Sequence, residues 1–118
     1  MLAGCNGGTV DEHALRQDGS AIDSLACEGR LLANDIADGH TIARFARMHA
    51  GKLAQRASNF EDALSSRPAR PAVVQRAHAL ARKAGSVSLL LGRLEAQPSD
   101  PSAARQVERL LIAAGDCQ

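Results

Sequence analysis

The sequence predicts an all-α protein, a small antiparallel bundle of four helices preceded by a short N-terminal helix. The chain has 118 residues, enough for one domain with a modest hydrophobic core. Its hydrophobic fraction of 45% is ordinary for a globular protein, but Ala and Leu dominate it, with two Phe and no Tyr or Trp. Ala and Leu favour helices, whereas strands favour β-branched and aromatic residues, so this composition indicates helices throughout.

Two helix-start signals lie close together near the N-terminus. Residues 9–12 read Thr-Val-Asp-Glu, the pattern of a capping box, and we expect the short helix that they open to stop at Gly19. Residues 20–38 then repeat apolar side chains at helical spacing, which predicts a second helix. Gly39 is the candidate end of that helix, because glycine readily adopts the left-handed conformation of a C-terminal cap.

Three further helices are predicted over residues 41–66, 69–97 and 100–115. The prolines of residues 67–71 mark the first turn, since each proline disfavours helix in the residue before it. Asp100 and Pro101 have the residue types preferred at an N-cap and at the first helical position, so they predict the start of the last helix.

Apolar spacing also assigns the core of these helices. In residues 41–66 it assigns Ile42, Phe45, Ala46, Ala50, Leu53, Ala57, Phe60 and Leu64. In residues 69–97 a 4-3-4-3 spacing assigns Val73, Ala77, Leu80, Ala84, Val87, Leu91 and Leu94. In the last helix the inner stripe is Val107, Leu110, Leu111 and Ala114.

The cysteines distinguish two topologies, which differ in whether the chain breaks at Gly39. With a break, counting residues between the turns places Cys117 ~6 Å along the bundle axis from Cys27, within reach of a disulfide. With one continuous helix over residues 20–66, the separation becomes ~43 Å and no bridge is possible. We favour the four-helix form with a Cys27–Cys117 disulfide; two unrelated thiols on a bundle with a long helix are the alternative.

The N-terminal segment Leu2-Ala3-Gly4-Cys5 resembles the lipobox of bacterial lipoproteins. The resemblance implies that the Cys5 thiol carries a diacylglyceryl group, that a peptidase cuts just before it, and that the protein is anchored in the cell envelope. It also implies a basic and then apolar signal region upstream; without one, the protein would stay in the cytoplasm. Residues 1–8 are then a lipobox remnant and a Gly-rich tether, and residues 9–118 the helical domain.

Charge is unevenly distributed although the net charge is only +1. Residues 1–40 hold seven acidic residues against two arginines, whereas no acidic residue lies between Asp62 and Glu95. One interpretation is that the acidic and basic segments lie together and compensate. The other is a basic contact surface for anionic lipid headgroups or an acidic protein. Its candidate residues are Arg70, Arg76, Arg82, Lys83 and Arg93.

Known catalytic and metal-binding patterns are missing from the sequence. The serines lie in turns and caps, and no metal-ligand spacing such as His-Glu-x-x-His or Cys-x-x-Cys occurs. The four histidines are predicted at different heights along the bundle axis, so no two of them meet at one ligand. We therefore expect no enzyme activity, cofactor or specific nucleic-acid partner, and predict an interaction or scaffold module. The alternatives are an exported bundle that binds a metal, haem or small apolar ligand, and an intracellular protein whose basic helix touches nucleic acid.

Overall fold

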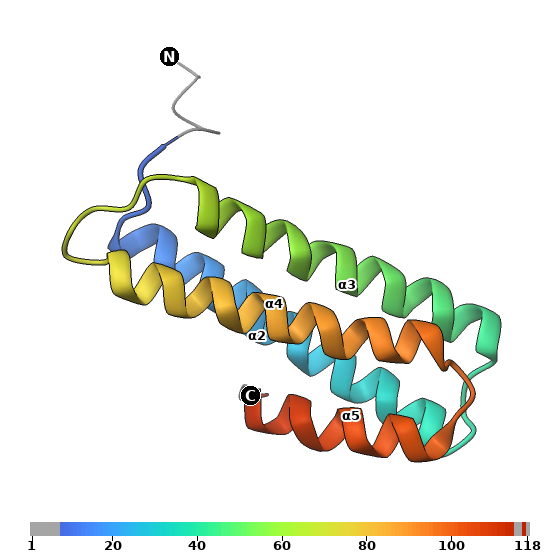
Figure 1. Ribbon diagram of the computed structural model, residues 1–118. Helices are drawn as coiled ribbons and strands as arrows, with labels where there is room; N and C mark the ends of the chain where they lie inside the picture. The colour runs from blue at the N-terminus through green and yellow to red at the C-terminus, as the bar shows by residue number, and fades with distance from the viewer. Residues whose placement is uncertain (1–7, 115–116, 118) are drawn as a thin grey trace.

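The computed structural model describes residues 8–114 and 117, and it is an antiparallel bundle of four helices (Figure 1). Along the chain these are α2 (Glu12–Ala37), α3 (Ala43–Ser66), α4 (Val74–Ala96) and α5 (Pro101–Ala114). The predicted all-α class is confirmed.

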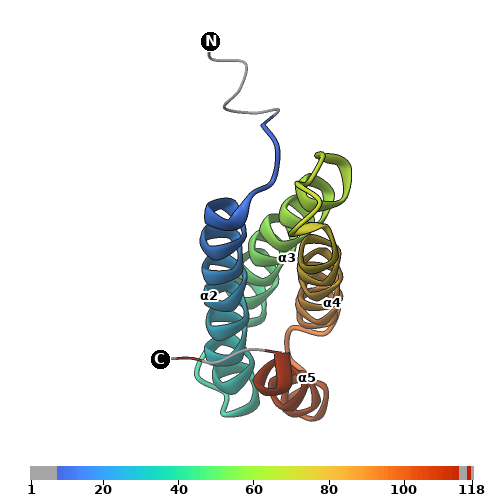
Figure 2. The ribbon, with the colours of Figure 1, turned by 90° about the vertical axis from the view of Figure 1, so that its left-hand side faces the viewer.

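The four helices differ in how many neighbours they contact. Helices α3 and α4 form the most extensive pair, and α2 packs against both of them. Helix α5 has 14 residues against 26 in α2, so it lies beside only the C-terminal half of α2 and the adjoining part of α4 (Figures 1 and 2). Among the described helices, α3 and α5 do not contact each other, and the outward side of α3 is therefore uncovered.

The break at Gly39 is confirmed, and the alternative of one helix over residues 20–66 is wrong. Gly39 has φ 72°, the left-handed conformation that glycine adopts at little cost. The backbone N–H groups of Gly39 and His40 donate to the carbonyls of Ile36 and Asp35, at 3.2 and 2.8 Å. These bonds satisfy carbonyls at the end of α2, and the chain then reverses into α3.

The predicted stop at Gly19 is wrong, because the short N-terminal helix and the helix after it form one helix, α2. The N-cap is Asp11, whose side chain accepts a hydrogen bond from the Ala14 N–H at 2.9 Å. A continuous helix lets both Leu15 and Ile22 reach the core. Their burial outweighs the roughly 1 kcal/mol that a glycine costs inside a helix.

The connection from α3 to α4 is longer than predicted, and α4 begins at Val74 instead of residue 69. Residues around Pro68 pair with the segment before α2: the Val10 N–H donates to the Pro68 carbonyl at 2.7 Å, and the Arg70 N–H donates to the Val10 carbonyl at 3.1 Å. Val10 is fully buried in this pairing. An extended chain here satisfies backbone groups that a helix would have used, which delays the start of α4.

Most of the predicted core is confirmed. The α4 seam is buried except for the partly buried Leu80, and α3 buries mainly small residues, Ala46, Ala50 and Ala57 among them. Ile42, Phe45 and Leu110 are exceptions, with 69%, 50% and 43% of their surfaces exposed. Phe45 lies one residue, or about 100° around the helix, from the buried Ala46, so it points to the uncovered side of α3.

Candidate functional site

A disulfide joins Cys27 in the middle of α2 to Cys117 near the chain end, as the four-helix form predicts. The Cα atoms are 5.3 Å apart across a sequence separation of 90. At the other end of α5, Arg105 sets the same register, because it donates to Asp38 Oδ1 at 2.6 Å and to Asn34 Oδ1 at 3.1 Å. The short α5 is thus attached to α2 at both of its ends.

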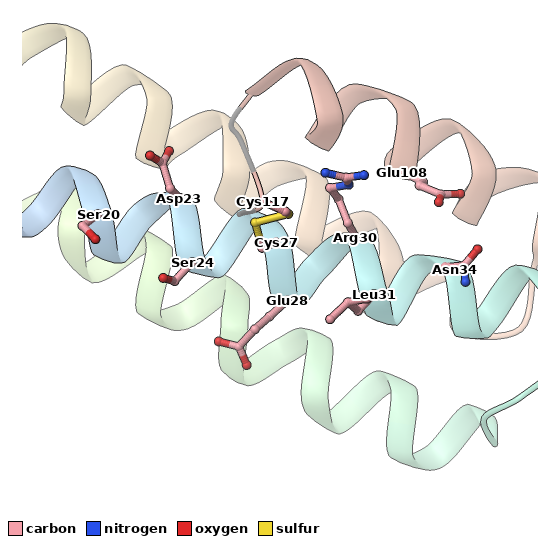
Figure 3. A pocket seen from close by; sticks show the side chains of 10 residues that line it. All are labelled: Ser20, Asp23, Ser24, Cys27, Glu28, Arg30, Leu31, Asn34, Glu108 and Cys117. Carbon is pink, nitrogen blue, oxygen red and sulfur yellow. A yellow bond between two sulfur atoms is a disulfide. The ribbon is translucent and has the colours of Figure 1, made fainter.

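An open hollow of about 860 Å³ lies beside the disulfide (Figure 3). The acidic side chains that line it point in different directions: Asp23 toward α4 and Glu28 toward α3 (Figure 3). Asp23 Oδ1 forms an ion pair with Lys83 Nζ of α4 at 2.5 Å. No group of three His, Cys, Asp or Glu side chains in the described part of the chain is placed to hold a metal ion. The hollow is therefore a surface depression whose polar groups do not converge.

The five predicted contact residues do not form one surface. Arg76 makes two hydrogen bonds to Glu12 of α2, at 2.7 and 2.5 Å, and Lys83 pairs with Asp23. These two α4 residues are compensated by the acidic α2, which supports the first of the two interpretations of the charge pattern. Arg70 lies in the connection before α4, where its backbone pairs with Val10.

The other two, Arg82 and Arg93, are exposed on α4. Neither forms an ion pair with another residue in the described ranges. Together with Arg70, whose exposed guanidinium also forms no ion pair among the described residues, they remain available for a contact, but Arg70 lies outside α4 and the three do not make the continuous basic face that the sequence suggested.

Sequence reasoning missed a second set of cations, on α3. Four exposed basic side chains lie there, and no acidic residue occurs between Asp38 and Glu61. That acid-free run is visible in the sequence and could have identified the set. The acidic α2 therefore contrasts with α3 as well as with the basic α4 that the sequence pointed to. The four residues are Arg44, Arg47, Lys52 and Arg56.

The histidines lie apart, and one of them is at the boundary of α2 and α3. His49 places Nε2 4.0 Å from Glu28 Oε1, and its ring centroid is 5.4 Å from that of Phe45. Its Nδ1 is buried without a hydrogen-bond partner among the described residues. A hollow of about 400 Å³ opens beside it, lined by Glu28, Lys52, Leu53 and Arg56 as well as His49. His13, His40 and His78 are exposed elsewhere.

The predicted lipidation site, Cys5, lies outside the described residues. The description begins at Gly8, whose carbonyl accepts a hydrogen bond from Arg67 Nε at 3.0 Å. Arg67 directly follows α3, so Gly8 lies beside the C-terminal end of that helix (Figure 1).

Charges at this end of the bundle are balanced. The pKa of Asp11 is lowered chiefly by the hydrogen bond from the Ala14 N–H, and the pKa of Glu12 by its hydrogen bonds from Arg76. The pKa of Asp18 is raised, because burial disfavours its ionised form more than the nearby Arg67 favours it. The end of the bundle at which Gly8 lies is therefore not a purely basic patch.

The chain matches no family model, no curated protein and no solved structure. None of the described helices has the length and apolar content needed to cross a membrane.

Proposed function

We propose that this protein is a lipid-anchored module of the bacterial cell envelope, which acts by contacting a partner and not by catalysis. The Cys27–Cys117 disulfide is the observation that supports this proposal most. Disulfides form and persist in oxidising compartments and are rare in the cytosol, so a bridge between helices α2 and α5 favours an exported protein. Its formation also leaves Cys5 as the thiol available for a lipid.

The position of the tether is compatible with an anchor at Cys5. Three residues of chain reach at most about 11 Å, so the Cα atom of the lipidated Cys5 would lie within that distance of the Gly8 Cα atom. The bundle would thus be held close to the bilayer by the end at which Val10 docks onto the chain after α3. That docking is fixed by backbone hydrogen bonds, so the anchor would constrain the position of the folded domain.

A non-catalytic role is proposed because the functional groups are dispersed. Asp23 and Glu28 near the disulfide diverge, the histidines lie apart and the hollow beside the disulfide is open. General acid–base or nucleophilic chemistry needs partners within hydrogen-bond reach of one another.

Mass spectrometry of the mature protein from bacterial membranes tests the proposal. The gene, with its own upstream sequence, is expressed in a bacterium alongside a Cys5→Ser variant. We expect the membrane-bound protein to begin at Cys5 and to carry the mass of a diacylglyceryl group, and the variant to lack that mass. A protein recovered only from the soluble fraction, with three free thiols and no lipid, would contradict both the anchor and the export.

A non-reducing peptide map of the same preparation tests the compartment separately. We expect a Cys27–Cys117 peptide in protein made with export and free thiols in protein retained in the cytoplasm. A Cys5 that is disulfide-bonded instead of lipidated would overturn the proposed anchor while leaving the export in place.

A further inference from the structure

Helix α3 presents to solvent a stripe of apolar and basic side chains that no other described helix covers. Phe45, Met48, Lys52 and Arg56 follow one another at spacings of three or four residues, which places them on one side of the helix. We call these four residues the α3 stripe. Phe45 and Met48 are 50% and 53% exposed, and Lys52 and Arg56 are exposed as well.

The stripe is cationic and remains so in the folded protein. Lys52 and Arg56 form no ion pair with any residue in the described ranges, in contrast to Arg76 and Lys83 of α4. Two acidic side chains of the described residues lie near it without pairing with Lys52 or Arg56: Glu28 of α2, which is nearest to His49 at 4.0 Å, and Glu95 of α4, whose carboxylate lies against Gly51. Arg44, next to Phe45, adds a third exposed cation at the start of the helix.

We propose that the α3 stripe docks on an anionic lipid bilayer, with Phe45 and Met48 entering the headgroup region and Lys52 and Arg56 meeting lipid phosphates. Exposed apolar side chains beside Lys and Arg on one helical face are the residue pattern of helices that lie in a membrane interface. The negative surface potential of an anionic bilayer attracts each such cation. The partner is thus identified by charge complementarity together with exposed apolar side chains.

A second copy of the chain fits the stripe less well than a bilayer does. A symmetric dimer with parallel α3 helices would bring Lys52 and Arg56 of one copy against the same cations of the other, which is repulsive. The apolar part consists of two side chains on a convex helix, which falls far short of the well-packed apolar centre of a stable protein interface. A bilayer requires no matching shape.

The proposal is compatible with the lipid anchor but does not depend on it. Helix α3 ends beside Gly8, so an anchor at Cys5 and the stripe would reach the same membrane, the first at one end of α3 and the second along it. Tethering raises the effective concentration of the stripe at the bilayer. The stripe is therefore tested on protein without lipid, where only the folded bundle can bind.

Vesicle co-sedimentation of the full chain carrying Cys5→Ser, in its oxidised form, tests the proposal. The vesicles are phosphatidylcholine with or without phosphatidylglycerol. We expect binding that requires phosphatidylglycerol and weakens with added salt. A Lys52→Gln/Arg56→Gln variant should bind about 25-fold more weakly, since each cation near an anionic surface contributes roughly a five-fold factor. Phe45→Ser should also weaken binding.

The matched control is Arg82→Gln/Arg93→Gln, which removes two exposed, unpaired cations from α4 instead of α3. We expect it to retain most of the binding, and far-UV circular dichroism verifies that every variant is folded. An equal loss in the control, or no phosphatidylglycerol-dependent binding at all, would overturn the proposal. Self-association without vesicles that Phe45→Ser abolishes would assign the stripe to a second copy. None of these outcomes bears on whether Cys5 is lipidated, which the mass measurement decides.

Discussion

Leu91 of α4 packs directly onto Gly29 of α2. A Cβ atom added at Gly29 would lie 2.6 Å from Leu91 Cδ2 and 3.0 Å from Leu111 Cδ1 of α5. Gly29 itself is buried, and both leucines are fully buried. The three helices that make up the disulfide-linked half of the bundle therefore meet at this glycine, and their close approach depends on the missing side chain.

Gly29→Ala is expected to destabilise the protein by about 1–3 kcal/mol, because the surrounding core has no room for the methyl group. The expected loss opposes the gain of up to about 1 kcal/mol that alanine brings to a helix interior. Urea unfolding of the oxidised protein measures it. Gly92→Ala is the control, since no atom lies within 4 Å of its added Cβ; it should stabilise the protein by about 0.5–1 kcal/mol. Equal stabilisation by both substitutions would contradict the close contact at Gly29.

Removing the disulfide with Cys27→Ser/Cys117→Ser is expected to cost about 3–5 kcal/mol of unfolding free energy. The bridge joins residues 90 apart, and closing so long a loop restricts the unfolded chain strongly. The measurement is urea unfolding of the variant beside the oxidised and reduced parent. Cys5→Ser should leave stability unchanged, because that residue lies outside the bridge. A cost below about 1 kcal/mol would show that the unfolded chain gains little freedom when the bridge is lost.

The sequence predicted correctly those features that depend on strong local signals. Gly39 is followed by a reversal because its left-handed conformation ends α2, and Asp100 caps α5 through hydrogen bonds from the N–H groups of Ser102 and Ala103. The Cys27–Cys117 pairing also followed from residue counting. The predicted pairing is correct although α4 begins later than predicted, because Arg105 fixes the register of α5 on α2 directly.

What could not be predicted depends on tertiary contacts. Gly19 resembles a helix stop locally, but the burial of Leu15 and Ile22 on either side of it favours one continuous helix. Phe45 fits the apolar spacing of α3, yet it is exposed because α5 is too short and too far away to cover that side. The sequence pattern identifies the apolar positions of a helix, but it does not show which other helix packs against each of them.

Two residues of the predicted basic contact surface are paired inside the bundle for the same kind of reason. Arg76 and Lys83 were expected to face a partner, but the packing of α4 beside the acidic α2 pairs them internally. No ion pair joins Arg44, Arg47, Lys52 or Arg56 of α3 to another described residue, and only the helix arrangement shows this.

The Lys83–Asp23 ion pair is expected to contribute less than about 1 kcal/mol to stability. Both side chains are partly exposed, at 31% and 40%, so water and salt screen their attraction. A double-mutant cycle with Lys83→Gln and Asp23→Asn, read by urea unfolding at low and high salt, measures the coupling directly. We expect a small coupling that decreases with salt. A salt-insensitive coupling of several kcal/mol would mean that the pair is desolvated and structurally required.

Asp18→Asn is expected to stabilise the protein at pH 7 but not at pH 3. The pKa of Asp18 is raised above 3.8 by burial, with Arg67 opposing the shift. The folded state therefore holds this proton more tightly than the unfolded state does. The resulting stabilisation is complete below the unfolded pKa and is lost as pH rises through the folded pKa. Asparagine carries no charge to desolvate, so the variant avoids that loss. Since Asp18 is only partly buried and water screens its charge, we expect a gain below about 1 kcal/mol.

Urea unfolding of parent and variant at pH 3 and pH 7 isolates this effect from the other carboxyl groups. Asp11 and Glu12 have lowered pKa values and contribute with the opposite sign, because the stability that they provide is lost as pH falls. Both proteins retain these two residues, so their contributions cancel in the difference. Adding Arg67→Gln removes the opposing attraction and should enlarge the gain at pH 7. If Asp18→Asn instead destabilises the protein at pH 7, the attraction to Arg67 exceeds the cost of burial, and the direction of the pKa shift is wrong.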